Sequence, residues 1–309
     1  MLLDLDTRGT AMPILTIRHL TTYRYRRPVA FGEHVMMLRP RDDEDQRVLD
    51  AAIEITPSPS RLSWTRDAFG NHLAVAAFAD RAEALTFSST ISVEHAPTGF
   101  DPGGIAEFAR TFPFAYPAEE RAGLAPFTIP IGPHPAVENW AAGFVAADGP
   151  TDTGELLVRM TRTIRRTCRH VARHEKGIQS PAETLQRASG SCRDLAVLMI
   201  AALRSLGFAA RFVSGYLRVA DDDDSLTGGN THAWVQVHVP GPGWVDFDPS
   251  SGAIGNRDLV RVAAVHDPVA AIPLQGSFYG AAEDHVAMQV AVKVTAVATG
   301  TDLIGRAGL

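Results

Sequence analysis

Cys192 is the residue of this chain best placed to act as a nucleophile. It is the third residue of Gly-Ser-Cys-Arg-Asp, directly before a run of apolar residues at helical spacing. Ser191 and Asp194 form a capping-box pattern that starts this helix, and Gly207 ends it. A thiol in the first turn lies in the positive field of unpaired N–H groups, and Arg193 adds a cation, so both favour thiolate. The same N–H groups can hold an oxyanion, whereas a cysteine packed as a small apolar residue also explains the position.

A histidine and two carboxylates lie on neighbouring strands of a predicted hairpin. Residues 231–238 alternate between polar and apolar, which puts His232 on a strand face and not in a loop. The strand after the Pro-Gly-Pro-Gly turn alternates too, so that Asp246 and Asp248 share one face. A carboxylate beside the imidazole would fix its tautomer and stabilise its charged form. His232 and Asp248 taken singly each have an ordinary structural explanation. Together with Cys192 they make a Cys-His-Asp relay, whose members must be close in space but not in the sequence.

The register of this hairpin decides which carboxylate faces the histidine. If residue 236 pairs with residue 244, Asp248 lies directly opposite His232. A two-residue loop would move Asp248 to the other face, so the catalytic interpretation predicts a longer loop or a bulge. Asp246 shares the face of Asp248 and stays open as an alternative partner.

The elements that must position these residues fall into two halves. Residues 14–94 hold short alternating runs separated by turn residues, which is typical of an antiparallel sandwich. Later in the chain helices come first and antiparallel strands after, so the fold class is α+β. We expect a β-rich domain at 12–100, a linker with the first core helix at 101–150, and a catalytic domain with C-terminal strands at 151–309.

Six short motifs occur in order along the second half. They are residues 181–185, 190–194, 203–207, 210–216, 231–234 and 243–250. This series resembles the bacterial transglutaminase-like domain. The first half resembles the β-rich region that precedes this domain in many bacterial members, at residues 19–25, 38–41 and 67–71. The resemblance implies a papain-like core with Cys192 as the nucleophile, His232 as general base and acid, and Asp248 as its orienting partner.

The chain departs from the family pattern near the expected site. Relatives often carry Phe-x-Tyr where this chain has Cys168 and His170, and Ser250 stands where Thr is common. The wall of the pocket is therefore expected to differ. The substrate-binding residues that we expect are Trp234, Arg193 and Asp246, with Trp234 packing around the site.

The composition excludes several function classes. A net charge of −6 over 309 residues offers no basic field for nucleic acid. No apolar run approaches the roughly 20 residues of a membrane helix, so no membrane association is expected. The two cysteines allow at most one disulfide, which favours a reducing compartment, the cytoplasm. The first eleven residues lack the pattern of a secretory signal, and Met12 is an alternative start.

Two further patterns carry less weight. His170 and His174 have a spacing that suits zinc, but no second cysteine pair or His-Glu-x-x-His motif accompanies them, so we expect no metal and no cofactor. The acidic run at 221–224 favours a solubilising loop over a mobile lid for basic substrates. It also lacks the spaced ligands of a calcium-binding EF-hand loop.

The sequence therefore predicts thiol-dependent acyl transfer at an amide bond of a peptide or protein. With water as acceptor the enzyme is a cysteine protease or amidase, and with an amine it is a transglutaminase; the relay is the same for both. Hydrolysis is favoured, because nothing in the chain indicates a second substrate site. The alternative is a binding or scaffold protein that keeps the fold without turnover, and the intact relay speaks against it.

Overall fold

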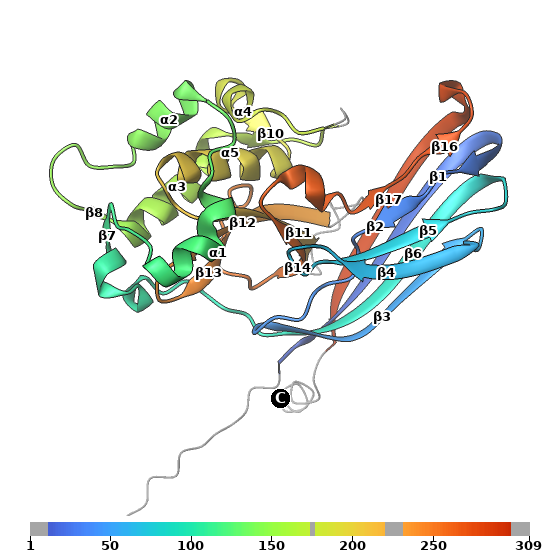
Figure 1. Cartoon of the computed structure of the whole chain (residues 1–309), viewed down its shortest axis with the longest axis horizontal. Coiled ribbons are helices and arrows are strands. Elements are labelled where there is room, and N and C mark those ends of the chain that lie inside the picture. Colours follow the sequence, from blue (N-terminus) through green and yellow to red (C-terminus); the bar gives the residue numbers. More distant parts are fainter. Residues whose placement is uncertain (1–11, 174–176, 220–230, 298–309) are drawn as a thin grey trace, which may run out of the picture.

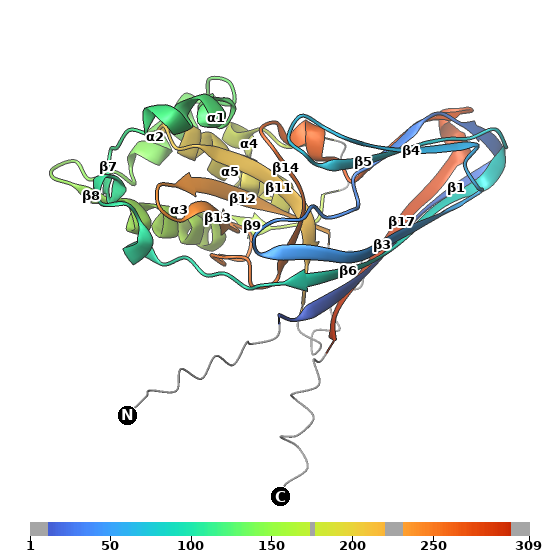
Figure 2. The ribbon, with the colours of Figure 1, turned by 60° about the horizontal axis from the view of Figure 1, so that its bottom comes forward.

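Residues 14–95, called the N-terminal half below, and the C-terminal end of the chain form a pair of antiparallel β-sheets (Figures 1 and 2). The computed structural model describes residues 12–173, 177–219 and 231–297, so His174 and the acidic run at 221–224 lie outside the described residues. The larger sheet has the order β16-β1-β6-β3, with β17 also paired to β1. Its strands are β1 (Ile14–Phe31), β3 (Gln46–Thr56), β6 (Ala82–His95), β16 (Phe278–Tyr279) and β17 (His285–Val297).

The smaller sheet faces the larger one and has the order β15-β2-β5-β4. Its strands are β2 (His34–Met36), β4 (Arg61–Arg66), β5 (His72–Ala77) and β15 (Leu274–Gln275). Side chains such as Phe31, Met36 and Phe87 fill the space between the sheets. The alternating pattern of the sequence thus forms the antiparallel sandwich that it predicts.

The C-terminal strands complete these sheets, which corrects the predicted division of the chain. β17 pairs with β1 from Ile14 to Tyr25, β16 pairs with the end of β1, and β15 pairs with β2. Residues 274–297 therefore do not belong with the catalytic domain, where the range 151–309 placed them. The alternation of a strand sets which side chains face the core, but it does not name the partner strand.

The second domain, which the sequence predicts to be catalytic, packs helices on a four-stranded antiparallel sheet (Figure 1). The sheet order is β13-β12-β11-β14, from β11 (Ala210–Leu217), β12 (Thr231–Val239), β13 (Gly243–Phe247) and β14 (Leu259–Val265). The helices are α1 (Ala118–Thr128), α2 (Pro135–Ala142), α3 (Thr153–Thr167), α4 (Pro181–Arg187) and α5 (Cys192–Ser205). This is the α+β arrangement expected from the sequence. Helix α1 lies in the predicted linker and is not expected from the sequence. Pro126 lies inside this helix, and proline is a residue that normally indicates a break in a helix.

Helix α5 is the centre of this domain. Its residues from Asp194 to Arg204 are all buried, and it lies against β11 and β12. Leu15 and Ile17 of β1 belong to the same apolar core as Leu198 of α5, so the two halves of the molecule share one core. Within the described ranges, no helix is long and apolar enough to cross a membrane.

Candidate active site

The start of helix α5 holds Cys192 in a tightly bonded turn. Ser191 caps the helix, and its backbone N–H and hydroxyl each donate to the carboxylate of Asp194 at 2.8 Å. Asp194 also accepts hydrogen bonds from Arg173 at 2.9 Å and from the backbone of Gln179 at 2.7 Å. The capping box is predicted from the sequence, whereas the two outer donors are not. They fix Asp194, and thereby the turn from which the thiol projects.

The side chains of His232, on β12, and Asp248, in the turn after β13, come together. The Nε2 atom of His232 lies 2.9 Å from a carboxylate oxygen of Asp248, and both side chains are buried. Asp248 also accepts from the hydroxyls of Ser250 at 2.7 Å and Ser251 at 2.6 Å. The carboxylate is therefore fully bonded, and since it occupies Nε2, the Nδ1 atom is left for the thiol of Cys192.

The hairpin register differs by two residues from the one considered in the sequence. Gln236 pairs with Asp246, and Val239 pairs with Gly243, which leaves a three-residue loop. The predicted longer loop is confirmed. Because a shift of two residues keeps every side chain on its face, Asp248 stays on the side of His232, in the turn that follows β13.

Electrostatics favour a thiolate beside an imidazolium. Burial by itself raises the pKa of the Cys192 thiol, but hydrogen bonds to His170 and His232, together with their charges, lower it from 9.0 to about 6. Burial opposes charge on His232 too, yet Asp248 and Cys192 raise its pKa to about 10. Although burial acts the other way, the bond to His232 lowers the pKa of Asp248 to about 2. The three groups thus share one proton, held on the imidazole.

His170 is a second imidazole at the thiol. It belongs to β9 (Arg169–His170), which pairs in parallel with β10 (Ser189–Gly190), so that His170 lies beside Gly190. The side chain is exposed, and its hydrogen bonding and charge help to lower the pKa of the Cys192 thiol. The sequence marks His170 only as a departure from the aromatic residue of relatives and as a weak zinc candidate. Its contact with the thiol depends on a short parallel ladder that no sequence pattern indicates.

Two family models match this chain in the same order as the two predicted regions. The "bacterial transglutaminase-like N-terminal region" matches residues 15–94, and the "transglutaminase-like superfamily" matches residues 139–249. Uncharacterized proteins of Mycobacterium tuberculosis and Mycobacterium bovis are each 30% identical over 287 residues, which covers 87% of this chain and 89% of theirs. The chain belongs to the transglutaminase-like superfamily.

The structure of a candidate cysteine protease from Cytophaga hutchinsonii shares the fold of this transglutaminase-like protein. The TM-score is 0.71 at 18% identity, over 93% of this chain and 91% of that one. The similarity therefore extends over both halves of the molecule. It includes the β-rich region as well as the core that carries Cys192.

The three expected substrate contacts of this transglutaminase-like protein are engaged within the chain. The guanidinium of Arg193 donates to the carbonyl oxygens of Pro268 and Ala271 and lies over the ring of Phe212. The indole N–H of Trp234 donates to Asp246 at 2.6 Å, and Trp234 stacks beside His232. These bonds place Trp234 against the imidazole of His232 and tie Arg193 to residues 268–271, while their contact with substrate stays a prediction.

Asp246, the alternative partner for the histidine, is bonded elsewhere. Its two oxygens accept from Trp234 and from Arg261, and its nearest strand partner is Gln236. Asp248 is therefore the carboxylate that meets His232. Within the residues that the structure describes, no group of three or more His, Cys, Asp and Glu side chains is arranged to hold a metal ion.

Proposed function

We propose that this protein is a thiol enzyme that transfers an acyl group from an amide bond of a peptide or protein substrate, with water favoured over an amine as acceptor. One observation carries the proposal. A thiol at a helix start has its pKa lowered by an imidazole, and a buried carboxylate 2.9 Å away holds that imidazole in place. This combination supplies a nucleophile, a proton carrier and an orienting group within direct contact.

The first half of the reaction follows from these positions. The thiolate of Cys192 attacks the carbonyl carbon of the amide, a C–S bond forms, and the carbonyl electron pair moves to oxygen. The N–H groups of the first turn of α5 stabilise this oxyanion. When the oxyanion collapses the C–N bond breaks, and the imidazolium of His232 gives its proton to the leaving amine. A thioester on Cys192 and a neutral imidazole remain.

The second half returns the enzyme to its starting state. A water molecule or an amine attacks the thioester carbon, and the neutral imidazole of His232 takes the proton that it releases. The C–S bond then breaks, which yields a carboxylic acid or a new amide and restores the thiolate–imidazolium pair. The same residues serve both acceptors, so the acceptor depends on how far the site excludes water. A free thiol needs a reducing environment, and we propose that the protein works in the cytoplasm.

Alkylation of the thiol across a range of pH tests the nucleophile. Iodoacetamide is applied to the native protein from pH 4 to 9, and mass spectrometry locates the label. Because the pKa of Cys192 is lowered to about 6, the labelling rate should rise through that pH, well below the ordinary thiol value of about 8.5. Cys168 is an internal control, since burial raises the pKa of its thiol. An ordinary profile, or label on Cys168 alone, would favour the non-catalytic scaffold.

Turnover on peptides, with and without an added amine, then separates the two acceptors. Cys192→Ala should abolish turnover, and Cys168→Ser should leave it nearly unchanged. Since the imidazolium persists up to a pKa of about 10, activity should rise through about pH 6 and fall above about pH 10. Turnover that survives in the Cys192→Ala variant would rule out a thiol mechanism.

A further inference from the structure

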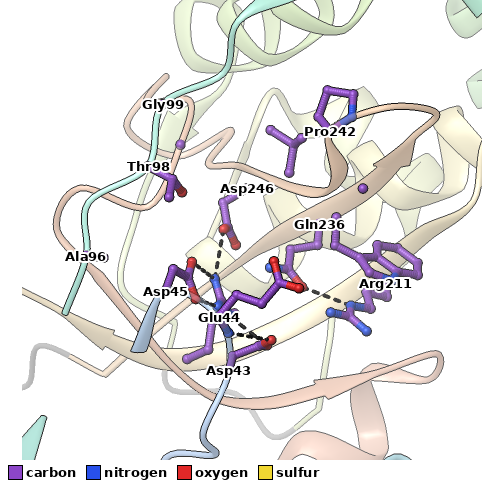
Figure 3. Close-up of a pocket in the computed structure, with 15 residues that line it drawn as sticks. Asp43, Glu44, Asp45, Ala96, Thr98, Gly99, Arg211, Gln236, Pro242 and Asp246 are labelled. Carbon is purple, nitrogen blue, oxygen red and sulfur yellow. Dashed lines mark hydrogen bonds and ion pairs between the residues drawn. The ribbon is translucent and has the colours of Figure 1, made fainter. Parts of the chain in front are cut away.

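An acidic turn at residues 43–46, where β3 begins, binds an arginine of the sheet that carries His232. Arg261 of β14 is only 3% exposed. Asp45 binds both of its terminal nitrogens, and Asp246 accepts from one of them at 3.1 Å. Figure 3 shows Asp45 and Asp246 approaching the same group, beside a cavity of about 560 Å³. The N-terminal half thereby places a carboxylate inside the polar network of the catalytic domain.

The backbone strengthens this junction between the halves. The side-chain amide of Gln46 donates to the carbonyl of Arg261 at 2.8 Å, and its oxygen accepts from the N–H of Arg261 at 2.9 Å. Asn256 donates to Asp45 as well. Two adjacent residues of the turn thus hold Arg261: Gln46 binds its backbone, and Asp45 binds its guanidinium. A buried guanidinium with this many bonds has one allowed position.

The same network continues to the catalytic histidine. Asp246, fixed by Arg261 on one oxygen, accepts the indole N–H of Trp234 on the other at 2.6 Å. The Trp234 ring lies 6.2 Å from the ring of His232, with 22° between their planes. A Cβ at Gly215 would lie 2.7 Å from the Trp234 ring, so the glycine lets the indole lie flat against β11. Trp234 is fully buried, so its indole N–H depends on Asp246 for a hydrogen-bond partner.

We propose that Asp45 is a positioning residue for His232, and that it acts through Arg261, Asp246 and Trp234. The inference rests on the proposed function, because it gives the N-terminal half a role in holding the general base. When Asp45 loses its charge, Asp246 at 3.1 Å and Asp43 at 3.5 Å are the carboxylates that still pair with Arg261, and the guanidinium is free to move with them. Trp234 then loses the fixed acceptor that keeps its ring parallel to the imidazole. The imidazole gains rotational freedom and holds the Cys192 thiolate less well.

The pH profile of Cys192 alkylation tests this role in the full chain. Asp45→Asn keeps the size of the side chain and removes its charge, and Trp234→Phe keeps a ring and removes the N–H donor. Each variant is expected to raise the midpoint of the profile by about one pH unit, a change of about tenfold in the thiol–thiolate equilibrium. The double variant should shift little further, since both changes break one chain of contacts. A residue needed only for folding would lower stability without moving this midpoint.

Asp258→Asn is the matched control. Asp258 also pairs with an arginine, Arg218, which directly follows β11, at 2.6 Å. Among the described residues, no hydrogen bond or ion pair joins its side chain to Arg261, Asp246 or Trp234. Its profile should match the wild type. If the wild type has its midpoint near pH 6 and neither Asp45→Asn nor Trp234→Phe moves it, the positioning role is overturned while the thiol mechanism stands. An ordinary midpoint in the wild type would instead overturn the proposed function. Should Asp45→Asn fail to fold, Trp234→Phe tests the same chain of contacts, because it removes the hydrogen bond between Trp234 and Asp246.

Discussion

The contact of His232 with Asp248 uses one ring nitrogen, and the proposed mechanism needs the other for the thiol. Nε2 meets Asp248 at 2.9 Å, which leaves Nδ1 for Cys192. Asp248→Asn keeps the shape but removes the charge that raises the pKa of His232, so the imidazolium and the thiolate both lose stability. We expect turnover to fall by about 10⁴-fold, as in the serine-protease triad when its Asp becomes Asn, measured as kcat on a peptide substrate. A larger loss in Asp246→Asn would show that the wrong carboxylate has been assigned.

His170 supplies the second prediction at the residue scale. It is one of the two imidazoles that lower the pKa of Cys192, and its removal takes that effect away. His170→Ala should therefore raise the midpoint of Cys192 alkylation by about one pH unit, with slower labelling at pH 6. His266→Ala, at an exposed histidine of the same domain, serves as the control. Equal profiles for both variants would mean that His232 alone stabilises the thiolate.

At the scale of elements, we expect the N-terminal cap of helix α5 to affect activity as well as stability. Ser191 caps the turn whose N–H groups we propose as oxyanion donors. Ser180 caps α4 in the same way, accepting from the N–H of Glu183 at 3.2 Å. Ser191→Ala and Ser180→Ala should each cost about 1 kcal/mol of stability, seen as a lower Tm. Only Ser191→Ala should also lower kcat, because its turn carries the oxyanion donors. Equal losses of kcat would refute a special role for the Ser191 turn.

Elements with strong local patterns can be predicted from the sequence, and pairings between distant residues cannot. The capping box and apolar face of α5 lie within sixteen residues of chain, from Ser191 to Leu206, so local chemistry determines them. The face of Asp248 follows from strand alternation, although the exact register does not. The contact of His170 with the thiol depends on a two-residue parallel ladder with β10, which leaves no pattern in the sequence.

The same limit explains the misplaced C-terminal strands at the scale of the whole molecule. β17 alternates like any half-buried strand, and its partner β1 lies at the other end of the chain. Nothing local distinguishes an added strand of the catalytic sheet from the strand that completes the N-terminal sheet. The family resemblance covers the catalytic motifs up to residue 250 and therefore gives no guidance beyond them.

Because β17 pairs with β1 and both halves share one apolar core, we predict that the two halves unfold together. Val294 of β17 pairs with Ile17, is 4% exposed, and belongs to the core that also contains Leu198 of α5. Val294→Asp buries a charge in this shared core and should cost about 3 kcal/mol or more. Val286→Asp, the same change at a 56% exposed site on the same strand, should cost little. In urea, far-UV circular dichroism and labelling of Cys168 should report one transition, which moves to lower urea only for Val294→Asp. Separate transitions would show instead that the halves fold independently, with the catalytic domain stable by itself.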